Sequence, residues 1–143
     1  MKKNQVIIFL LNFVVCGLLG WCFECFWTGL SSLFQKNRKL SCQTSLWMFF
    51  IYGMAAIIGP IYRFMARFPF WVRGGIYAIA IYLVEYLTGS VLKRFRACPW
   101  NYSKCKHNIK GLINMDYAGA WFVMGLIYEK ILIFTSRFFE SFL

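Results

Sequence analysis

Four long apolar runs dominate this sequence and limit the folds that it can adopt. They cover about residues 6–33, 44–62, 74–92 and 116–139. An α-helix rises 1.5 Å per residue, so about 20 residues cross a hydrocarbon core of roughly 30 Å. Since backbone polar groups cannot stay unpaired in lipid, runs of this length are expected to be helices. The sequence therefore predicts an all-α, polytopic integral membrane protein: a four-helix bundle that forms a single domain over residues 1–143.

The composition favours a membrane protein over a soluble one. Hydrophobic residues make up 60% of the chain, against roughly 45–50% in soluble globular proteins. The net charge is +11, but the basic residues stand in short clusters between the apolar runs, such as Lys93, Arg94 and Arg96. Basic clusters that flank apolar spans favour contact with anionic lipid head groups. We therefore expect the lipid bilayer as a partner and no nucleic acid.

The first run is expected to be a retained helix rather than a cleaved signal peptide. Lys2 and Lys3 precede it, as basic residues precede a signal sequence. However, its uncharged part, residues 6–23, exceeds the roughly 7–15 apolar residues of a signal peptide, and no small-residue cleavage site follows.

Small residues and a proline stand near the end of the second run. Gly59 and Pro60 predict a kink there. Ala55 and Gly59 have the small-xxx-small spacing that lets two membrane helices approach closely. We therefore expect a close helix contact along this stripe.

The first and third runs share a pattern that indicates an internal repeat. One reads Trp21-x-x-Glu24-x-x-x-Thr28-Gly29 and the other reads Tyr82-x-x-Glu85-x-x-Thr88-Gly89. Each is followed by a basic loop and then by a run with an early tryptophan, Trp47 or Trp121. Two helix-loop-helix copies would share one orientation in the membrane, related by an axis along the membrane normal.

Four of the five acidic residues lie in or at the edge of apolar runs: Glu24, Glu85, Asp116 and Glu129. A charge at the centre of a membrane helix costs roughly 2.5–3.5 kcal/mol, so each needs a function or a partner. The functional hypothesis is that Glu24, Glu85 and Asp116 line a polar pocket for a cation, a proton or a polar head group. In the structural alternative, the acids donate hydrogen bonds between helices in their neutral form or pair with basic residues: Arg63, Arg73, Arg94 or Arg96.

We expect neither a metal site nor a cofactor. His107 is the only histidine, and Lys104 and Lys106 beside it oppose the charge of a metal ion. Cys22 and Cys25 match a C-x-x-C pattern, but no second pair of ligands accompanies them. The sequence contains no Walker loop, G-x-S-x-G, H-E-x-x-H or dinucleotide fingerprint.

A loop signature and its neighbours resemble a known family. The signature is Cys98-Pro99-Trp100-x-Tyr102-Ser103, flanked by Tyr82-x-x-Glu85-x-x-Thr88-Gly89, Gly111-Leu112-Ile113 and Tyr117-Ala118-x-x-Trp121-Phe122-x-x-Gly125-Leu126-Ile127-x-Glu129. It resembles the transmembrane protein 229 family, which is similar to a bacterial group described as type IV ABC-transporter permeases. The resemblance covers nearly the whole chain. It implies a polytopic four-helix protein. Because the sequence shows no nucleotide-binding domain, we expect a membrane subunit, with a partner membrane subunit or a second copy of itself as candidate partners.

One position departs from the family's pattern. Relatives usually carry Asp between the Trp and Tyr of the signature, where this chain has Asn101. An acid or metal-ligand role is therefore not expected there, although the turn-forming side chain is kept. Asn101-Tyr102-Ser103 also matches the N-glycosylation pattern, which we interpret as a turn because it lies close to the membrane. Glu24, Glu85 and Glu129 match acids of the family.

Three functions remain open from the sequence. The first is a small permease-like or transport-associated subunit with Glu24 and Glu85 on a polar path. The second is a membrane-embedded, lipid-modifying enzyme, with Glu85 or Asp116 as the base and the basic loop holding a phosphate head group. The third is a non-catalytic scaffold whose acids only lock the helices. A protein without enzymatic activity is favoured, and the substrate is not indicated.

The orientation in the membrane is also open. Basic residues are shared too evenly between the two sets of loops for the positive-inside rule to decide. Because disulfides form only in an oxidising compartment, the state of three loop cysteines depends on this orientation: Cys42, Cys98 and Cys105.

Overall fold

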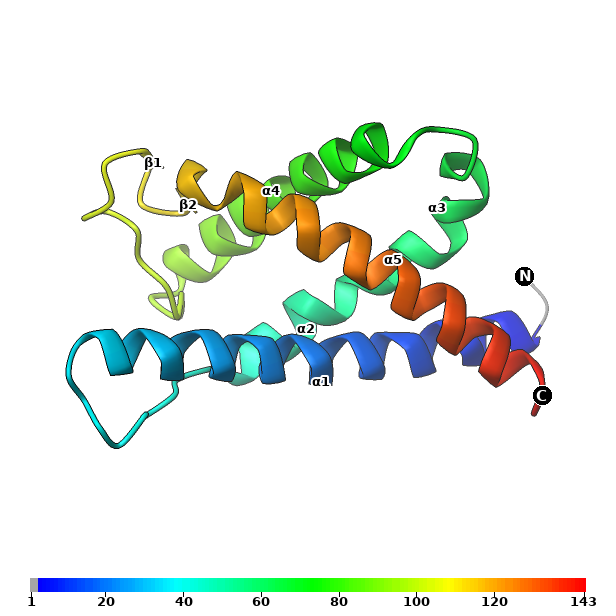
Figure 1. Cartoon of the computed structure of the whole chain (residues 1–143), viewed down its shortest axis with the longest axis horizontal. Coiled ribbons are helices and arrows are strands. Elements are labelled where there is room, and N and C mark those ends of the chain that lie inside the picture. The colour runs from blue at the N-terminus through cyan, green and yellow to red at the C-terminus, as the bar shows by residue number, and fades with distance from the viewer. Residues whose placement is uncertain (1–2) are drawn as a thin grey trace. The chain divides into compact units, whose positions relative to one another are not determined.

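The four apolar runs are helical in the computed structural model, which describes residues 3–143 (Figure 1). Lys2, one of the two lysines before the first run, lies outside the described residues. The elements in chain order are α1 (Lys3–Phe34), α2 (Leu46–Gly53), the 3-10 helix η1 (Met54–Ile57), α3 (Ile58–Met65), α4 (Phe70–Arg94), β1 (Asn108–Ile109), β2 (Ile113–Asn114), the 3-10 helix η2 (Met115–Tyr117) and α5 (Ala118–Glu140). The predicted all-α class is confirmed, with only a short antiparallel pair of strands added.

Within residues 3–143, four helical segments are long and apolar enough to cross a membrane: Asn4–Phe34, Leu46–Met65, Phe70–Arg94 and Met115–Glu140. In the most apolar part of each, only 22% of the residues are buried inside the protein. The remaining apolar side chains need lipid around them, because exposed apolar surface on this scale is unfavourable in water. The protein is therefore an integral membrane protein, as predicted.

The third span begins earlier than the sequence pattern predicted. Its helix starts at Phe70 rather than near Gly74, directly after Pro69 in an extended conformation. Proline favours the start of a helix because the first N–H groups have no partner within the helix. As a result, Arg73 belongs to the membrane helix and not to the loop before it.

The second span changes its hydrogen-bonding pattern in the middle, where α2 gives way to η1 before α3 begins. Pro60 lacks the N–H that would bond to the carbonyl of Ala56, and its ring crowds that carbonyl. The predicted irregularity is therefore present, but it falls in the turn before the Gly59–Pro60 pair. The close contact predicted at Gly59 is wrong, because a Cβ placed there meets no described atom within 4 Å.

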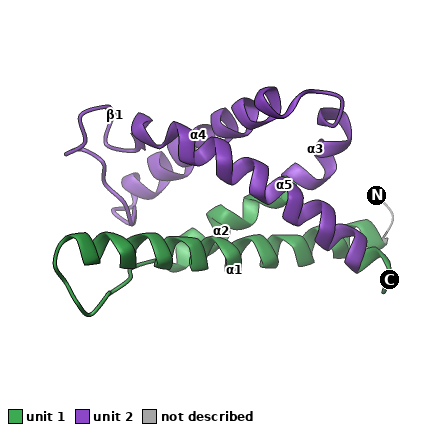
Figure 2. Ribbon diagram, viewed as in Figure 1, with its two compact units in different colours: residues 1–57, 139–143 green, residues 58–138 purple. Residues whose placement is uncertain are grey.

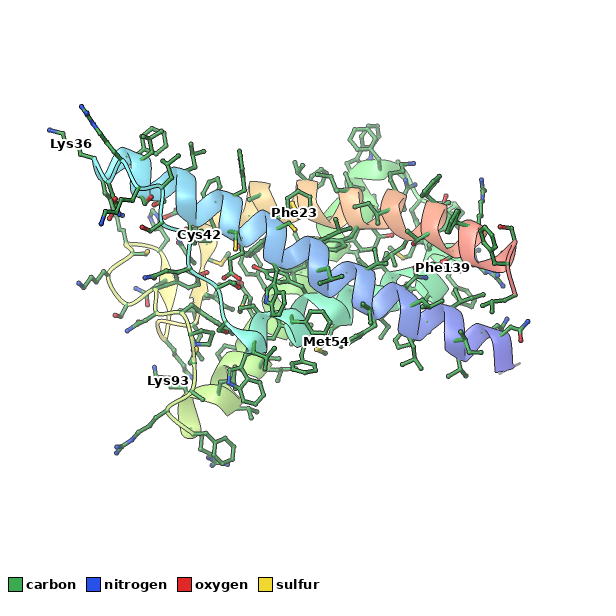
Figure 3. The ribbon with its side chains drawn as sticks, turned by 90° about the horizontal axis from the view of Figure 1, so that it is seen from below. Phe23, Lys36, Cys42, Met54, Lys93 and Phe139 are labelled. Atoms are coloured by element: carbon green, nitrogen blue, oxygen red, sulfur yellow. The ribbon has the colours of Figure 1, made fainter. Side chains whose placement is uncertain are left out.

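The chain divides into two compact units, which are considered separately (Figure 2). The first contains residues 1–57 and 139–143, with α1 packed against α2. Glycines allow this contact: a Cβ on Gly17 would lie 2.7 Å from the ring of Phe49, and a Cβ on Gly20 would overlap the side chain of Tyr52. Lys36 lies beyond the end of α1, and Cys42 lies on the segment that returns to α2 (Figure 3).

The second unit contains residues 58–138, including α4, the two strands and most of α5. Contacts between α4 and α5 also depend on glycines. A Cβ on Gly74 would overlap the ring of Phe122, and a Cβ on Gly125 would overlap the side chain of Tyr77. The segment between the two helices folds back so that Leu112 and Ile113 are buried.

Candidate functional site

Glu24 lies in the second half of α1 and is held by the segment that enters α2. Its Oε2 accepts a 2.5 Å hydrogen bond from Thr44 Oγ1. Trp21, one turn earlier, donates from Nε1 to the carbonyl of Ser45 at 2.9 Å. Thr28 Oγ1, one turn later, accepts from the backbone N–H of Gln43 at 3.0 Å. One face of α1 is thereby bound to three consecutive residues of the returning chain.

Glu85 has a corresponding place in α4. Its Oε2 accepts a hydrogen bond of 3.2 Å from the indole Nε1 of Trp121 in α5. Tyr82, one turn earlier, donates to the backbone carbonyls of Asn114 and Met115, each at 3.2 Å. The returning segment therefore crosses the face of α4 that carries the glutamate.

These contacts support the predicted internal repeat. In each unit, an aromatic side chain three residues before the glutamate donates to the chain entering the next helix. The glycine after the threonine is also approached by the returning segment in both units. A Cβ on Gly29 would lie 3.4 Å from the Leu40 carbonyl, and one on Gly89 would lie 2.9 Å from the Trp100 ring. The glutamate partners differ, a threonine hydroxyl in one unit and an indole in the other.

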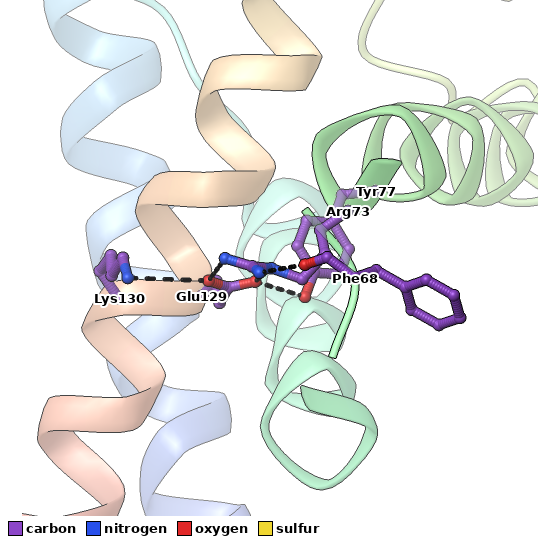
Figure 4. Close-up of polar contacts among 5 residues, drawn as sticks. All are labelled: Phe68, Arg73, Tyr77, Glu129 and Lys130. Atoms are coloured by element: carbon purple, nitrogen blue, oxygen red, sulfur yellow. Dashed lines mark hydrogen bonds and ion pairs between the residues drawn. The ribbon is translucent and has the colours of Figure 1, made fainter. Parts of the chain in front are cut away.

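Glu129 has a different environment, because it is ion-paired within the second unit (Figure 4). Its carboxylate is fully buried and accepts from Arg73 Nε at 2.8 Å and from Arg73 Nη2 at 3.1 Å. Tyr77 Oη donates a third hydrogen bond of 2.7 Å. Arg73 is one of the basic residues that we predicted from the sequence as partners of the acids. Tyr77 was not predicted as a partner. The i, i+4 spacing of Arg73 and Tyr77 could have indicated that both reach one carboxylate.

Asp116 lies in η2 and not in an apolar span interior. Its Oδ1 is 2.8 Å from His107 Nδ1, and both side chains are more than half exposed, 56% and 58% respectively. Asp116 and Glu85 thus have different side-chain partners. Because Glu24 lies in the other unit, a pocket shared by Glu24, Glu85 and Asp116 remains a prediction.

The Cys98–Ser103 signature shapes the loop between α4 and α5. Cys98 Sγ donates to the carbonyl of Trp100 at 3.3 Å, and Trp100 Nε1 donates to the carbonyl of Leu112 at 3.0 Å. Asn101 Oδ1 accepts the N–H of Ser103 at 2.9 Å, which confirms the predicted turn. No disulfide joins any two of the six cysteines, all of which lie within the described residues 3–143.

The sequence did not predict a cavity of about 270 Å³ beside this signature. It is lined by residues from the end of α4 and from both ends of the loop: Lys93, Arg96, Cys98, Trp100, Asn101, Gly111 and Leu112. No sequence signal marks it, because its walls meet only when the loop folds back. Nearby, Lys110 Nζ lies 2.9 Å from Tyr86 Oη, and this contact raises the pKa of Lys110 above its ordinary value.

Metal ligands do not gather in the part of the chain that the structure describes. Among residues 3–143, no three side chains of His, Cys, Asp or Glu are placed to hold one ion.

Apolar helices, buried or half-buried carboxylates and a basic loop at the end of a span define a polytopic α-helical membrane protein with polar groups inside its spans. The chain belongs to the family described as "Putative ABC-transporter type IV", whose model matches residues 11–142. No solved structure matches the chain.

Replacement of Asn101 by alanine is expected to lower the free energy of unfolding by about 1 kcal/mol, because the N–H of Ser103 loses its acceptor. Asn101→Asp should retain most of this stability, since a carboxylate accepts the same bond. Thermal unfolding in detergent micelles measures both. Ser103→Ala is the control, because Ser103 contributes its backbone N–H to the turn, and a comparable loss in this variant would contradict the assignment.

Proposed function

We propose that this protein is a small membrane subunit of a transport system and that Glu24 and Glu85 face a polar path through it. The observation that carries the proposal is the pairing of these two carboxylates with neutral donors alone. Thr44 bonds Glu24 and Trp121 bonds Glu85. Within residues 3–143 neither carboxylate takes part in an ion pair, whereas Glu129 does.

A half-buried carboxylate in a membrane span is stabilised when it binds a cation or a proton. Its charge is costly in an apolar environment, and one neutral hydrogen bond offsets only part of that cost. A proton, or a cation passing through a hydrated path, would neutralise the charge. Glu24 and Glu85 hold corresponding positions in the two units, as expected for an internal repeat.

The family supports a role in transport, and the sequence limits which part of a transporter this chain can be. It contains no Walker loop. For a transport system driven by ATP, the proposal assigns the nucleotide site to a partner subunit. The resemblance of the sequence to the transmembrane protein 229 family is part of the same proposal. A second copy of this chain is the alternative partner.

A lipid-modifying enzyme is less well supported by the geometry. Such an enzyme needs an acid or base beside the group that it attacks. The residues that line the cavity near the basic loop include no Asp or Glu. The two predicted bases are not among these lining residues: Asp116 lies beside His107, and Glu85 lies beside Trp121.

The proposal predicts that Glu85→Gln and Glu24→Gln each reduce cation movement by about tenfold or more, since the amide cannot carry the charge that attracts the cation. Purified protein in liposomes that contain a pH-sensitive dye would be exposed to a proton gradient, with Na⁺ or K⁺ as counter-ion. Glu140→Gln is the matched control, because Glu140 is exposed at the end of α5.

The alternatives give different results in the same experiment. If the Glu85→Gln protein melts at a lower temperature but moves protons as fast as the wild type, the acids only stabilise the packing of the helices. If the wild-type protein moves protons no faster than empty liposomes with either counter-ion, the proposed path is absent. Lipid profiling of cells that lack the protein tests the enzymatic alternative, which predicts an altered lipid species.

A further inference from the structure

The residues that line the cavity at the end of α4 carry positive charge, which favours an anionic ligand. Two of its lining residues are cationic, Lys93 and Arg96, and none is acidic. The Arg96 guanidinium makes no hydrogen bond or ion pair with any residue that the structure describes. Lys93 Nζ donates one bond, of 3.0 Å, to the carbonyl of Lys110. Both side chains therefore retain N–H donors for an anion.

The surrounding loop strengthens this positive charge. Residues 93–115 contain six basic residues and no acidic one: Lys93, Arg94, Arg96, Lys104, Lys106 and Lys110. The first acid that follows, Asp116, is paired with His107. An uncompensated cluster of this kind produces a positive potential that concentrates anions.

The backbone holds Arg96, which lines the cavity, in a left-handed conformation with φ of 55°. The helix ends there with two characteristic bonds, from the N–H of Arg96 to the Lys93 carbonyl at 3.1 Å and from the N–H of Ala97 to the Leu92 carbonyl at 2.8 Å. Glycine is the usual residue at this position, because a Cβ is disfavoured there. Arginine stands at this position despite the cost of its Cβ, as expected if its side chain has a function.

The cavity also lies at the end of a membrane span, since the third span ends at Arg94. The neighbouring Phe95 is apolar and 74% exposed, and Trp100 lines the cavity. Aromatic residues of this kind gather at the level of lipid head groups. Lys93 marks the place where α4 passes into the loop (Figure 3).

We propose that this cavity binds a phosphate group through Lys93 and Arg96, carried either by an anionic phospholipid head group or by free phosphate. Guanidinium and ammonium groups form strong charge-assisted hydrogen bonds with phosphate oxygens. The site is independent of the transport proposal, because it contains neither Glu24 nor Glu85. Each can therefore fail while the other holds.

The test compares a cavity variant with a variant of equal charge elsewhere in the loop. Lys93→Gln with Arg96→Gln removes both cations from the cavity, whereas Lys104→Gln with Lys106→Gln removes two that do not line it. Protein in a neutral detergent would be titrated with short-chain phosphatidylglycerol, short-chain phosphatidylcholine and inorganic phosphate. Native mass spectrometry and calorimetry would measure the binding.

We expect the cavity variant to bind phosphatidylglycerol about tenfold more weakly or worse, which corresponds to the loss of charge-assisted bonds. The loop control should stay close to the wild type. Binding of inorganic phosphate as well as the lipid would identify free phosphate as an acceptable ligand, and binding of the lipid alone would identify the head group.

Two results would overturn the proposal. One is a wild-type protein that binds phosphatidylglycerol no better than phosphatidylcholine and does not bind phosphate. The other is an equal loss of binding in both double variants, which would indicate a diffuse field rather than a cavity. If the cavity variant does not fold, the single variant Arg96→Gln replaces it in the binding test, because the Arg96 side chain makes no hydrogen bond or ion pair within the described chain.

Discussion

Replacing Arg73 by alanine is expected to lower the free energy of unfolding by about 3–5 kcal/mol, because the buried carboxylate of Glu129 loses the cation that is hydrogen-bonded to it. Glu129 is fully buried and accepts two hydrogen bonds from the Arg73 guanidinium, at 2.8 and 3.1 Å. The hydrogen bond from Tyr77 remains in the variant but carries no charge. Reversible unfolding in mixed micelles, followed by circular dichroism, measures the loss.

Two further variants show whether the ion pair itself is responsible. Leucine at both positions removes the unpaired charge, so Arg73→Leu with Glu129→Leu should recover much of the stability that Arg73→Leu loses. Lys130→Gln should change the stability by less than about 1 kcal/mol. Lys130 Nζ lies 4.0 Å from Glu129 Oε1, but its side chain is 72% exposed. An Arg73→Ala protein as stable as the wild type would show that the pair contributes little.

Alanine in place of Gly20 or Gly125 is expected to lower the free energy of unfolding by about 1–3 kcal/mol, through overlap in closely packed contacts. A Cβ on Gly20 would overlap Tyr52 in the first unit, and a Cβ on Gly125 would overlap Tyr77 in the second. Because the clash involves the Cβ of Tyr77 and the Cβ and ring of Tyr52, relief requires the helices to move. Thermal and denaturant unfolding in micelles would detect the effect.

The matched controls are Gly75→Ala and Gly119→Ala. A Cβ at either position meets no described atom within 4 Å. Alanine is the better helix former by roughly 0.5–1 kcal/mol, so these two variants should be as stable as the wild type or more stable. If all four substitutions have the same effect, helix propensity rather than packing governs these sites.

The spans were predictable because length and hydropathy are local properties. A run such as residues 74–92 must be helical in lipid whatever surrounds it, and the helix found there differs mainly in starting at Phe70. The turn at Asn101 was predictable for the same reason, since the bond to the N–H of Ser103 spans only two residues. The candidate acids Glu24 and Glu85 were visible because a carboxylate in an apolar run is rare.

The partners of these acids were not predictable, because they come from distant parts of the chain. Arg73 and Glu129 are 56 residues apart, and Glu85 and Trp121 are 36 residues apart. A small-xxx-small pattern describes one helix only. It indicated Gly59, where no described atom lies within 4 Å of a Cβ, and did not identify Gly20 or Gly125, where tyrosine side chains lie close.

The sequence by itself determined that this protein lies in the membrane, how many spans cross it, and which acids lie within those spans. Each of these properties depends on the transfer of short segments from water to lipid. The tertiary structure alone decided that Glu129 is ion-paired while Glu24 and Glu85 have neutral partners. It also brought Lys93 and Arg96 to one cavity. Such contacts depend on which faces meet after the chain has folded back, and hydropathy along the chain does not encode that choice.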